Sequence, residues 1–250
     1  MFIRSIHLEN FRNYGRLDLD VGPSVNIFYG NNAQGKTNLL EAISYAGSGK
    51  SFRAQKTSEM IRFGADFADI EAKVFAQGRE QELRYVLFSG SRPRQIWRNG
   101  ARKKTAADIA GVLPTVLFCP EDLMVLKSGA SARRRLGDMA LCQLRPNYDA
   151  ALAEYGKILE QKSHILKDRF DDPRLLDILP EYNARLCRVG AMLISYRARF
   201  YESLGREAAV FHGQFSGGAE DFRLEYKTVS TVDDPFAPIS QIEEQLHRHL

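Results

Sequence analysis

Eight consecutive residues, 30–37, read Gly-Asn-Asn-Ala-Gln-Gly-Lys-Thr and fit the pattern G-x-x-x-x-G-K-[ST] without a gap. The two glycines let the backbone curl until several N–H groups point at one anion, and the lysine then reaches the outer phosphates of a nucleotide. The hydroxyl at the last position holds magnesium. The pattern therefore predicts a phosphate-binding loop made of Gly30, Asn31, Asn32, Ala33, Gln34, Gly35, Lys36 and Thr37, with Mg²⁺ on Thr37.

The residues on either side of this loop fit the same interpretation. Residues 24–29 are a short β-prone run that predicts a buried strand leading into the loop. Apolar residues recur at helical spacing from Leu39 to Ala46, which predicts a helix that begins at Lys36 and ends at Gly47. The positive N-terminal end of that helix would face the phosphates. The alternative is a glycine turn that binds no nucleotide.

Composition sets the remaining bounds. The chain has 250 residues and is 44% hydrophobic, enough for a well-buried core in one large or two modest domains. It contains no apolar run long enough to span a bilayer and no signal-like N-terminus, so we expect a cytoplasmic protein without a membrane partner. Three widely spaced cysteines suit neither a disulfide framework nor a metal site.

Alternating patterns predict antiparallel strands in the first half of the chain. Residues 2–21 suggest two strands, and residues 68–76 and 83–87 alternate in the same way on both sides of a turn at Gln77-Gly78. A short helical piece is expected from Ser58 to Phe63. This first half therefore reads as a meander with one polar face.

Two motifs carry a resemblance to a known family. Residues 8–14 read L-x-N-F-R-N-Y, and residues 30–43 read G-x-N-x-Q-G-K-T-N-L-L-E-A-I. Together with Lys50-Ser51-Phe52-Arg53, this resembles the RecF family, in the SMC/Rad50-like branch of the ABC ATPases. The resemblance implies that ATP is the nucleotide and that Arg12 lies near its phosphates. Without the resemblance, Arg12 reads as the solvated end of a strand.

The same resemblance gives the expected fold class: α/β, with a P-loop ABC-type ATPase core, an antiparallel β-meander and a helical arm lobe. We expect the core lobe at residues 1–119 and the mainly helical lobe at 120–250. Within the helical lobe the patterns predict helices over 131–145, 147–170 and 174–211, and the beginning of another over 239–250. A returning strand is expected at Leu224-Glu225-Tyr226.

Family members continue for roughly another hundred residues, which supply an S-x-G-Q-like signature motif and a Walker B aspartate. Neither motif occurs in residues 1–250. The resemblance therefore implies that the C-terminal part of the core is missing, through a fragment, an interrupted gene or a shortened product. Hydrolysis needs those groups, so we expect ATP binding without competence for turnover.

Two stretches imitate nucleotide motifs. Residues 47–51, Gly-Ser-Gly-Lys-Ser, look like the end of a phosphate loop, but Ser44 stands where the first glycine is needed and a helix precedes them. Glu121 and Asp122 follow an apolar run at 114–118, which predicts a strand and invites a Walker B interpretation. Cys119 and Pro120 separate the acids from that run, so we reject this interpretation too.

Residues 89–107 contain six cations and no acid, although the whole chain carries a net charge of only +4. A basic hairpin with Trp97 between its cations could follow a nucleic-acid backbone by pairing with phosphates and stacking on bases. The candidate DNA-binding residues are Arg94, Arg98, Arg102, Lys103 and Lys104. The alternative is a hairpin that is basic for solubility and to prevent edge pairing.

The resemblance implies an ATP-dependent DNA-binding protein of recombinational DNA repair and replication restart. The implied partners are single-stranded and gapped double-stranded DNA, a RecR-type mediator and, for the intact family, a second copy in an ATP-dependent homodimer. Two alternatives stay open: a DNA- or partner-binding module without nucleotide turnover, and a stand-alone P-loop kinase of small molecules, which the meander and helical arm fit poorly.

Overall fold

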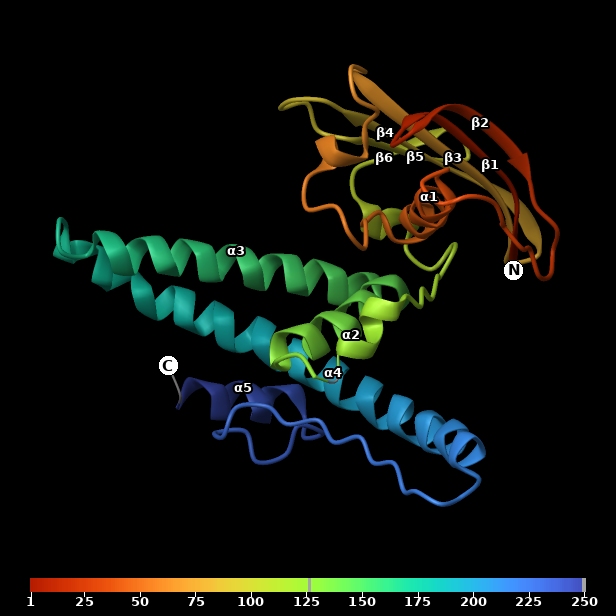
Figure 1. The fold of residues 1–250 in the computed structure, drawn as a ribbon. Helices are drawn as coiled ribbons and strands as arrows, with labels where there is room; N and C mark the ends of the chain where they lie inside the picture. Colours follow the sequence, from red (N-terminus) through yellow and green to blue (C-terminus); the bar gives the residue numbers. More distant parts are fainter. Residues whose placement is uncertain (126, 249–250) are drawn as a thin grey trace. The chain divides into compact units, whose positions relative to one another are not determined.

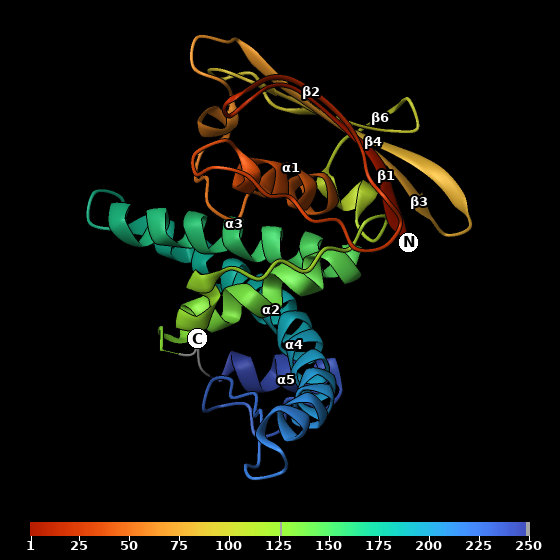
Figure 2. The same cartoon turned by 45° about the vertical axis from the view of Figure 1, so that its right-hand side comes forward.

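We describe a computed structural model of the chain, covering residues 1–125 and 127–248 and leaving out the side chain of Glu121 (Figures 1 and 2). The chain divides into two compact units. The first comprises Met1–Lys127 together with Cys142–Pro146, and the second comprises Ser128–Leu141 and Asn147–Leu250. Each unit is described by itself below.

The first unit is built on one antiparallel sheet with the order β2-β1-β3-β4-β5-β6. Its strands are β1 (Phe2–Phe11), β2 (Tyr14–Asp20), β3 (Phe67–Ala76), β4 (Arg79–Phe88), β5 (Gln95–Arg98) and β6 (Ala101–Lys103). The alternating patterns in the sequence predicted four of these strands. In the register of the sheet, Leu8 lies opposite Ile70, which lies opposite Tyr85.

Helix α1 (Lys36–Ser48) covers the apolar face of this sheet (Figure 1). Ile6, Leu8, Ile70 and Leu83 are at most 1% exposed on that face and belong to the same core as Ala42 of the helix. Burying such side chains stabilises the unit by roughly 1.5–3 kcal/mol each. The helix is therefore fixed against the sheet through its apolar face, and its N-terminal end presents the phosphate-loop residues.

Three short 3₁₀ helices complete the first unit: Thr57–Met60, Ala106–Ile109 and Pro120–Met124. The first of them overlaps the helical piece expected from Ser58 to Phe63, although it begins one residue earlier and ends at Met60. Helix α1 also ends differently from the prediction. Its C-terminal cap is Gly49, whose N–H bonds the carbonyl of Tyr45 at 2.7 Å, while Gly47 is a buried residue inside the helix.

Two predicted strands are wrong. Residues 24–29 and 114–118 are without assigned secondary structure, and Val25, Tyr29 and Val116 are among the most exposed apolar side chains of the unit. A strand exists only where a neighbouring backbone accepts its ladder of hydrogen bonds. Among the described residues, no backbone pairs with either segment, so their β-prone composition alone does not produce a strand.

The second unit is helical. Its helices are α2 (Ala130–Leu144), whose last residues belong to the first unit, α3 (Pro146–Asp168), α4 (Leu179–Ser216) and α5 (Ile239–His247), with a 3₁₀ helix at Pro173–Ile178. Helices α3 and α4 run side by side in both views (Figures 1 and 2). The predicted helices are found with shifted ends, and the last two residues of the expected helix at 239–250 lie outside the described residues.

A polar network and a small apolar cluster hold this unit together. Arg197 of α4 makes two 2.9 Å hydrogen bonds to the carboxylate of Asp138 in α2, and a third, also 2.9 Å, to the hydroxyl of Tyr148 in α3. Because three helices share these bonds, the network fixes their mutual register. Ala191 and Ile194 of α4 pack with Ile242 of α5 in a separate apolar cluster.

The returning strand expected at Leu224-Glu225-Tyr226 is also wrong. Residues 220–228 are extended and make no backbone–backbone hydrogen bond among the described residues. Tyr226 instead stacks on Tyr201 of α4, with ring centroids 5.8 Å apart. Among residues 1–125 and 127–248, no helix combines the length and the apolar composition that crossing a membrane requires.

Candidate nucleotide-binding site

The loop at residues 30–37 turns sharply and leads directly into α1. Its φ angles are +145° at Gly30, +65° at Ala33 and +104° at Gly35, and α1 begins at Lys36 with Gly35 as its N-cap. Among the described residues, no side chain caps this helix end and no acid lies in its first turn. The free N–H groups and the positive end of the helix dipole therefore remain available for an anion.

Lys36 is folded over the loop that precedes it. Its Nζ donates to the carbonyl oxygens of Gly30 at 2.8 Å and of Asn31 at 2.6 Å. These bonds hold the ammonium group above the curled backbone and not out in solvent. The positive charge thus lies where the sequence pattern requires it.

Asn13 of the turn between β1 and β2 and Tyr14, the first residue of β2, support the loop from behind. Asn13 Nδ2 donates to the carbonyl of Gln34 at 3.2 Å, and the hydroxyl of Tyr14 donates to the carbonyl of Gly35 at 3.1 Å. A Cβ on Gly35 would come within 2.7 Å of the Asn13 amide, and φ there is in the left-handed region. Only glycine therefore fits at this position between the turn and the helix.

A buried carboxylate lies one helical turn beyond the loop. Glu41 of α1 is 0% exposed. It accepts bonds from Arg12 Nη2 at 2.7 Å and Nε at 2.8 Å, and from Arg53 Nη2 at 2.7 Å and Nε at 3.0 Å. The hydroxyl of Ser51 adds a fifth bond at 2.6 Å. We call Glu41, Arg12, Arg53 and Ser51 the Glu41 cluster.

The electrostatics of the cluster favour the charged carboxylate. Burial alone would raise the pKa of Glu41, but the hydrogen bonds from Arg12, Arg53 and Ser51 outweigh it and hold the pKa below its usual range. One carboxylate faces two guanidinium groups, so the cluster keeps a surplus positive charge. The side chain of Arg53 is 37% exposed and that of Arg12 19%, so Arg53 presents more of this charge to solvent.

Arg12 reaches the cluster from a constrained turn. Its φ is +54°, which costs an L-residue roughly 1–2 kcal/mol. Its backbone N–H bonds the carbonyl of Met60 at 2.8 Å, and its guanidinium also donates to the carbonyl of Glu59. The structure thus places Arg12 beside α1, where it bonds Glu41 and the backbone of a 3₁₀ helix. Its predicted proximity to phosphates stays a prediction.

The predicted metal ligand Thr37 is exposed at the first turn of α1. The described residues contain no group of acids, histidines and cysteines arranged for a metal ion. The carboxylate of Asp122 accepts a bond from the backbone N–H of Cys119 at 2.7 Å, so it caps the 3₁₀ helix at Pro120–Met124. This engagement favours the rejection of Asp122 as a magnesium ligand, whereas the side chain of Glu121 lies outside the described residues.

The candidate DNA-binding residues are distributed over both faces of the β5–β6 hairpin. Trp97 lies opposite Arg84 on one side and Arg102 on the other, so these three share the face that points away from α1. Arg98 and Lys103 belong to the opposite, core-side face, since the neighbour of Lys103 is the buried Ile96. Arg98 Nε is bonded to Gln81 Oε1 at 2.8 Å.

The remaining two candidates differ in their surroundings. Arg94 turns inward, where its guanidinium donates to the hydroxyl of Tyr45 at 2.8 Å and to the carbonyl of Gly49. Lys104 is exposed beyond the end of β6. Arg102 and Lys104 are therefore the candidates that present their charge most openly, and sequence spacing alone could not separate them from Arg94 and Arg98.

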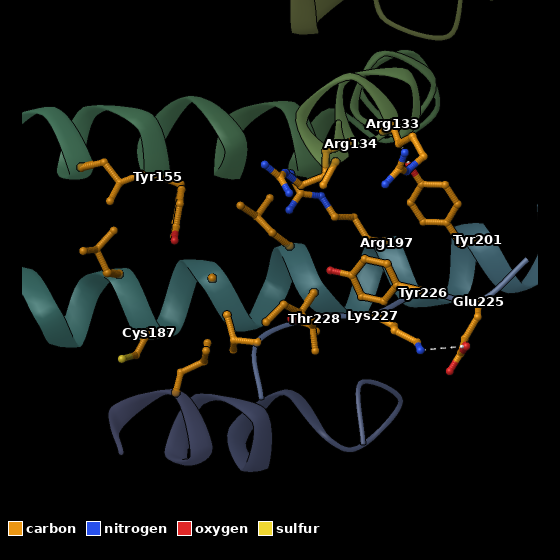
Figure 3. Close-up of a pocket in the computed structure, with 18 of the residues that line it drawn as sticks. Arg133, Arg134, Tyr155, Cys187, Arg197, Tyr201, Glu225, Tyr226, Lys227 and Thr228 are labelled. Atoms are coloured by element: carbon orange, nitrogen blue, oxygen red, sulfur yellow. Dashed lines mark hydrogen bonds and ion pairs between the residues drawn. The ribbon is translucent and has the colours of Figure 1, made fainter. Parts of the chain in front are cut away.

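The second unit contains a cavity of about 1070 Å³ between α3, α4 and the extended segment at 224–229 (Figure 3). Arg197 and the stacked rings of Tyr201 and Tyr226 lie along it, and Glu225 pairs with Lys227 on the segment that forms one wall. Within the part of the chain that the structure describes, no backbone ladder fixes the position of that segment. We therefore assign the candidate site to the phosphate loop, whose position is fixed by several side-chain contacts.

The sheet, the loop and the uncapped helix together define a protein of the α/β class with a P-loop fold. Residues 5–123 match a family described as an AAA domain. The chain is 39% identical to a DNA replication and repair protein RecF of Agathobacter rectalis over 94% of its own length, and 37% identical to one of Shouchella clausii over 99%. It belongs to the RecF family.

Solved structures agree with this assignment. Two structures of the recombination mediator protein RecF in the RecFOR pathway, described as RecF-ATP and RecF-ATPrS, superpose with TM-scores of 0.92 and 0.91 at 30% identity over the whole chain. The predicted fold class, a P-loop ABC-type core with a helical arm, is thereby confirmed. The chain spans 64% of the Agathobacter rectalis relative and 66% of each of these structures.

Proposed function

We propose that this chain binds ATP with Mg²⁺ at residues 30–37. The observation that carries the proposal is the uncapped start of α1 directly behind the curled loop, with the Lys36 ammonium held over it. Backbone N–H groups of the loop would hold the phosphates, Lys36 would pair with the outer ones, and the Thr37 hydroxyl would hold the metal. Related RecF proteins described with ATP support the choice of nucleotide.

We further propose that the nucleotide serves DNA binding in recombinational repair and replication restart, as the names of the relatives suggest. Single-stranded or gapped DNA, a RecR-type mediator and a second copy of the chain are the proposed partners. The exposed cations Arg102 and Lys104 beside Trp97 are the part of the hairpin best suited to phosphates and bases. This part of the proposal rests on membership of the RecF family and on the exposed cations of the β5–β6 hairpin.

A second candidate function is a DNA- or partner-binding module that holds ATP without cleaving it. Cleavage needs carboxylates that fix the metal and orient water. Asp122 is engaged as a helix cap, and residues 1–250 contain no S-x-G-Q-like sequence. Both proposals place ATP at residues 30–37. The alternative makes DNA or partner binding the function in itself, with no role for nucleotide turnover.

Titration of the purified chain with a fluorescent ATP analogue and Mg²⁺ tests nucleotide binding. The wild-type chain is expected to bind, and Lys36→Ala is expected to lose binding while keeping its circular dichroism spectrum, because the loop is held by backbone geometry and by Asn13 and Tyr14. Lys73→Ala is the control, since Lys73 is an exposed lysine of β3 in the same unit. Unchanged binding by a folded Lys36→Ala variant would contradict the proposal.

A further inference from the structure

A chain of hydrogen bonds connects the buried carboxylate of Glu41 to the phosphate loop. Arg53 bonds Glu41 and also donates to Oδ1 of Asn38 in α1. Asn38 Nδ2 donates to Asn13 Oδ1 at 2.6 Å, and Asn13 Nδ2 in turn donates to the carbonyl of Gln34 in the loop. Every link joins residues at least 12 positions apart in the sequence, and the last one reaches the backbone of the loop.

The geometry of α1 explains why one carboxylate can organise this arrangement. Thr37 and Asn38 lie four and three residues before Glu41, so the three side chains share one face of the helix. Helical side chains also tilt toward the N-terminus. Glu41 therefore points back toward the loop, and the two guanidinium groups that it holds lie beside the first turn of α1.

The segments held by Glu41 would otherwise be independent of one another. Arg12 belongs to the turn between β1 and β2, whereas Arg53 and Ser51 follow the end of α1. The next two residues after Arg12 are Asn13 of that turn and Tyr14, which begins β2, and they contact the carbonyls of Gln34 and Gly35. Fixing Arg12 thus fixes the residues that support the loop.

We infer that Glu41 is a positioning residue for the nucleotide: its carboxylate holds Arg12 and Arg53 so that the β1–β2 turn and Asn38 keep the phosphate loop in its binding conformation. This inference rests on the proposed binding of ATP at residues 30–37. Under this inference, the surplus positive charge of the Glu41 cluster lies on the side of α1 that faces the triphosphate. A purely structural carboxylate would stabilise the fold without any effect on nucleotide affinity.

The chain provides a matched control. Asp69 of β3 is 5% exposed and is bonded by Arg84 through Nε at 3.1 and 3.0 Å and through Nη2 at 2.5 Å. It is a second buried carboxylate with a guanidinium partner in the same unit, on the sheet and not on α1. Among the bonds of the described residues, none connects Asp69 to the loop.

The experiment compares ATP dissociation constants of the wild-type chain, Glu41→Gln, Arg53→Lys and Asp69→Asn, at a temperature where circular dichroism shows each to be folded. We expect Glu41→Gln to weaken binding by roughly 10-fold or more, the scale of losing a supporting partner behind a preorganised site. Asp69→Asn is expected to stay within about 2-fold of the wild type while losing thermal stability.

Arg53→Lys keeps the positive charge but loses the forked guanidinium, which bonds both Glu41 and Asn38. We therefore expect a smaller loss of ATP affinity than in Glu41→Gln. This variant tests the inference even if Glu41→Gln does not fold. Wild-type affinity in the folded Glu41→Gln or Arg53→Lys variant would overturn the inference and leave the proposed function standing. A wild-type chain that binds no ATP would overturn the proposed function, and the inference with it.

Discussion

Gly47 of α1 lies against the backbone carbonyl of Leu113, so close that a Cβ on Gly47 would be 2.3 Å from the Leu113 oxygen and 2.8 Å from a methyl group of Thr115. The contact joins the C-terminal end of the phosphate-loop helix to the segment that precedes residues 114–118. Since the Leu113 oxygen belongs to the backbone, it cannot rotate away as a side chain could. The helix position therefore depends on the absence of a side chain at residue 47.

Gly47→Ala is expected to destabilise the first unit by about 1–3 kcal/mol, the usual cost of overpacking a filled interior. Chemical denaturation followed by circular dichroism measures the change. Gly156→Ala is the control, because Gly156 is an exposed glycine of α3 with no atom within 4 Å of its added Cβ. That control should gain up to about 1 kcal/mol from helix propensity. If Gly47→Ala and Gly156→Ala had equal free energies of unfolding, the close approach of Gly47 to the Leu113 carbonyl would be contradicted.

Glu41 predicts a pH dependence of stability. Its pKa is lowered in the folded state, so its stabilising contribution is fully present above the pKa of an unfolded glutamate, about 4.3, and is lost as pH falls through the lower folded value. The difference in unfolding free energy between the wild type and Glu41→Gln should be largest near pH 7 and shrink below about pH 4. A difference that does not vary over this range would show that Glu41 is uncharged in the folded protein.

The two faces of the β5–β6 hairpin predict different effects on DNA binding. Arg102→Glu should weaken binding to single-stranded DNA and reduce the slope of log affinity against log salt by about one unit, as expected for a lost phosphate contact. Arg98→Glu should leave the slope unchanged, because the Arg98 guanidinium faces the core side and bonds Gln81. If neither substitution alters the slope, the hairpin is basic for solubility and does not contact DNA.

The polypeptide of residues 1–250 is expected to bind ATP without cleaving it above background, with or without DNA. Cleavage depends on groups that hold metal, water and the γ-phosphate, and their transition-state stabilisation is worth several orders of magnitude in rate. Single-turnover cleavage of radiolabelled ATP measures this. Asp122→Asn should leave the rate of ATP cleavage unchanged, because the Asp122 carboxylate caps a 3₁₀ helix. DNA-stimulated cleavage that falls in Asp122→Asn would identify Asp122 as a metal ligand after all.

Sequence reasoning located the curled loop and the start of the helix behind it because their signal is local. The same pattern that fixes the turn also fixes where the next helix starts, and α1 does begin at Lys36. The strands expected at 24–29 and 114–118 failed because a strand depends on a partner backbone, which composition within a segment does not report. Among the described residues that partner is absent.

The sequence did not predict the Glu41 cluster, for a related reason. A signal was present, since Glu41 interrupts the apolar face that Leu39 and Ala42 share, and a charged residue in such a position needs a partner. Nothing in the local pattern identifies Arg12 and Arg53 as those partners, because they come from 29 and 12 residues away. Such long-range pairing becomes visible only when the sheet and the helix are in place.

The extended segment at 220–228 determines where the helical unit can be cut. No ladder among residues 1–125 and 127–248 protects its amides, and Arg223 and Lys227 are exposed on it. Trypsin should therefore cleave the native chain there before it cleaves the helices. The piece released from the covalent chain would carry α5. Because Ile242 is buried against Ala191 and Ile194 of α4, the two pieces should stay together after cleavage and separate only in denaturant.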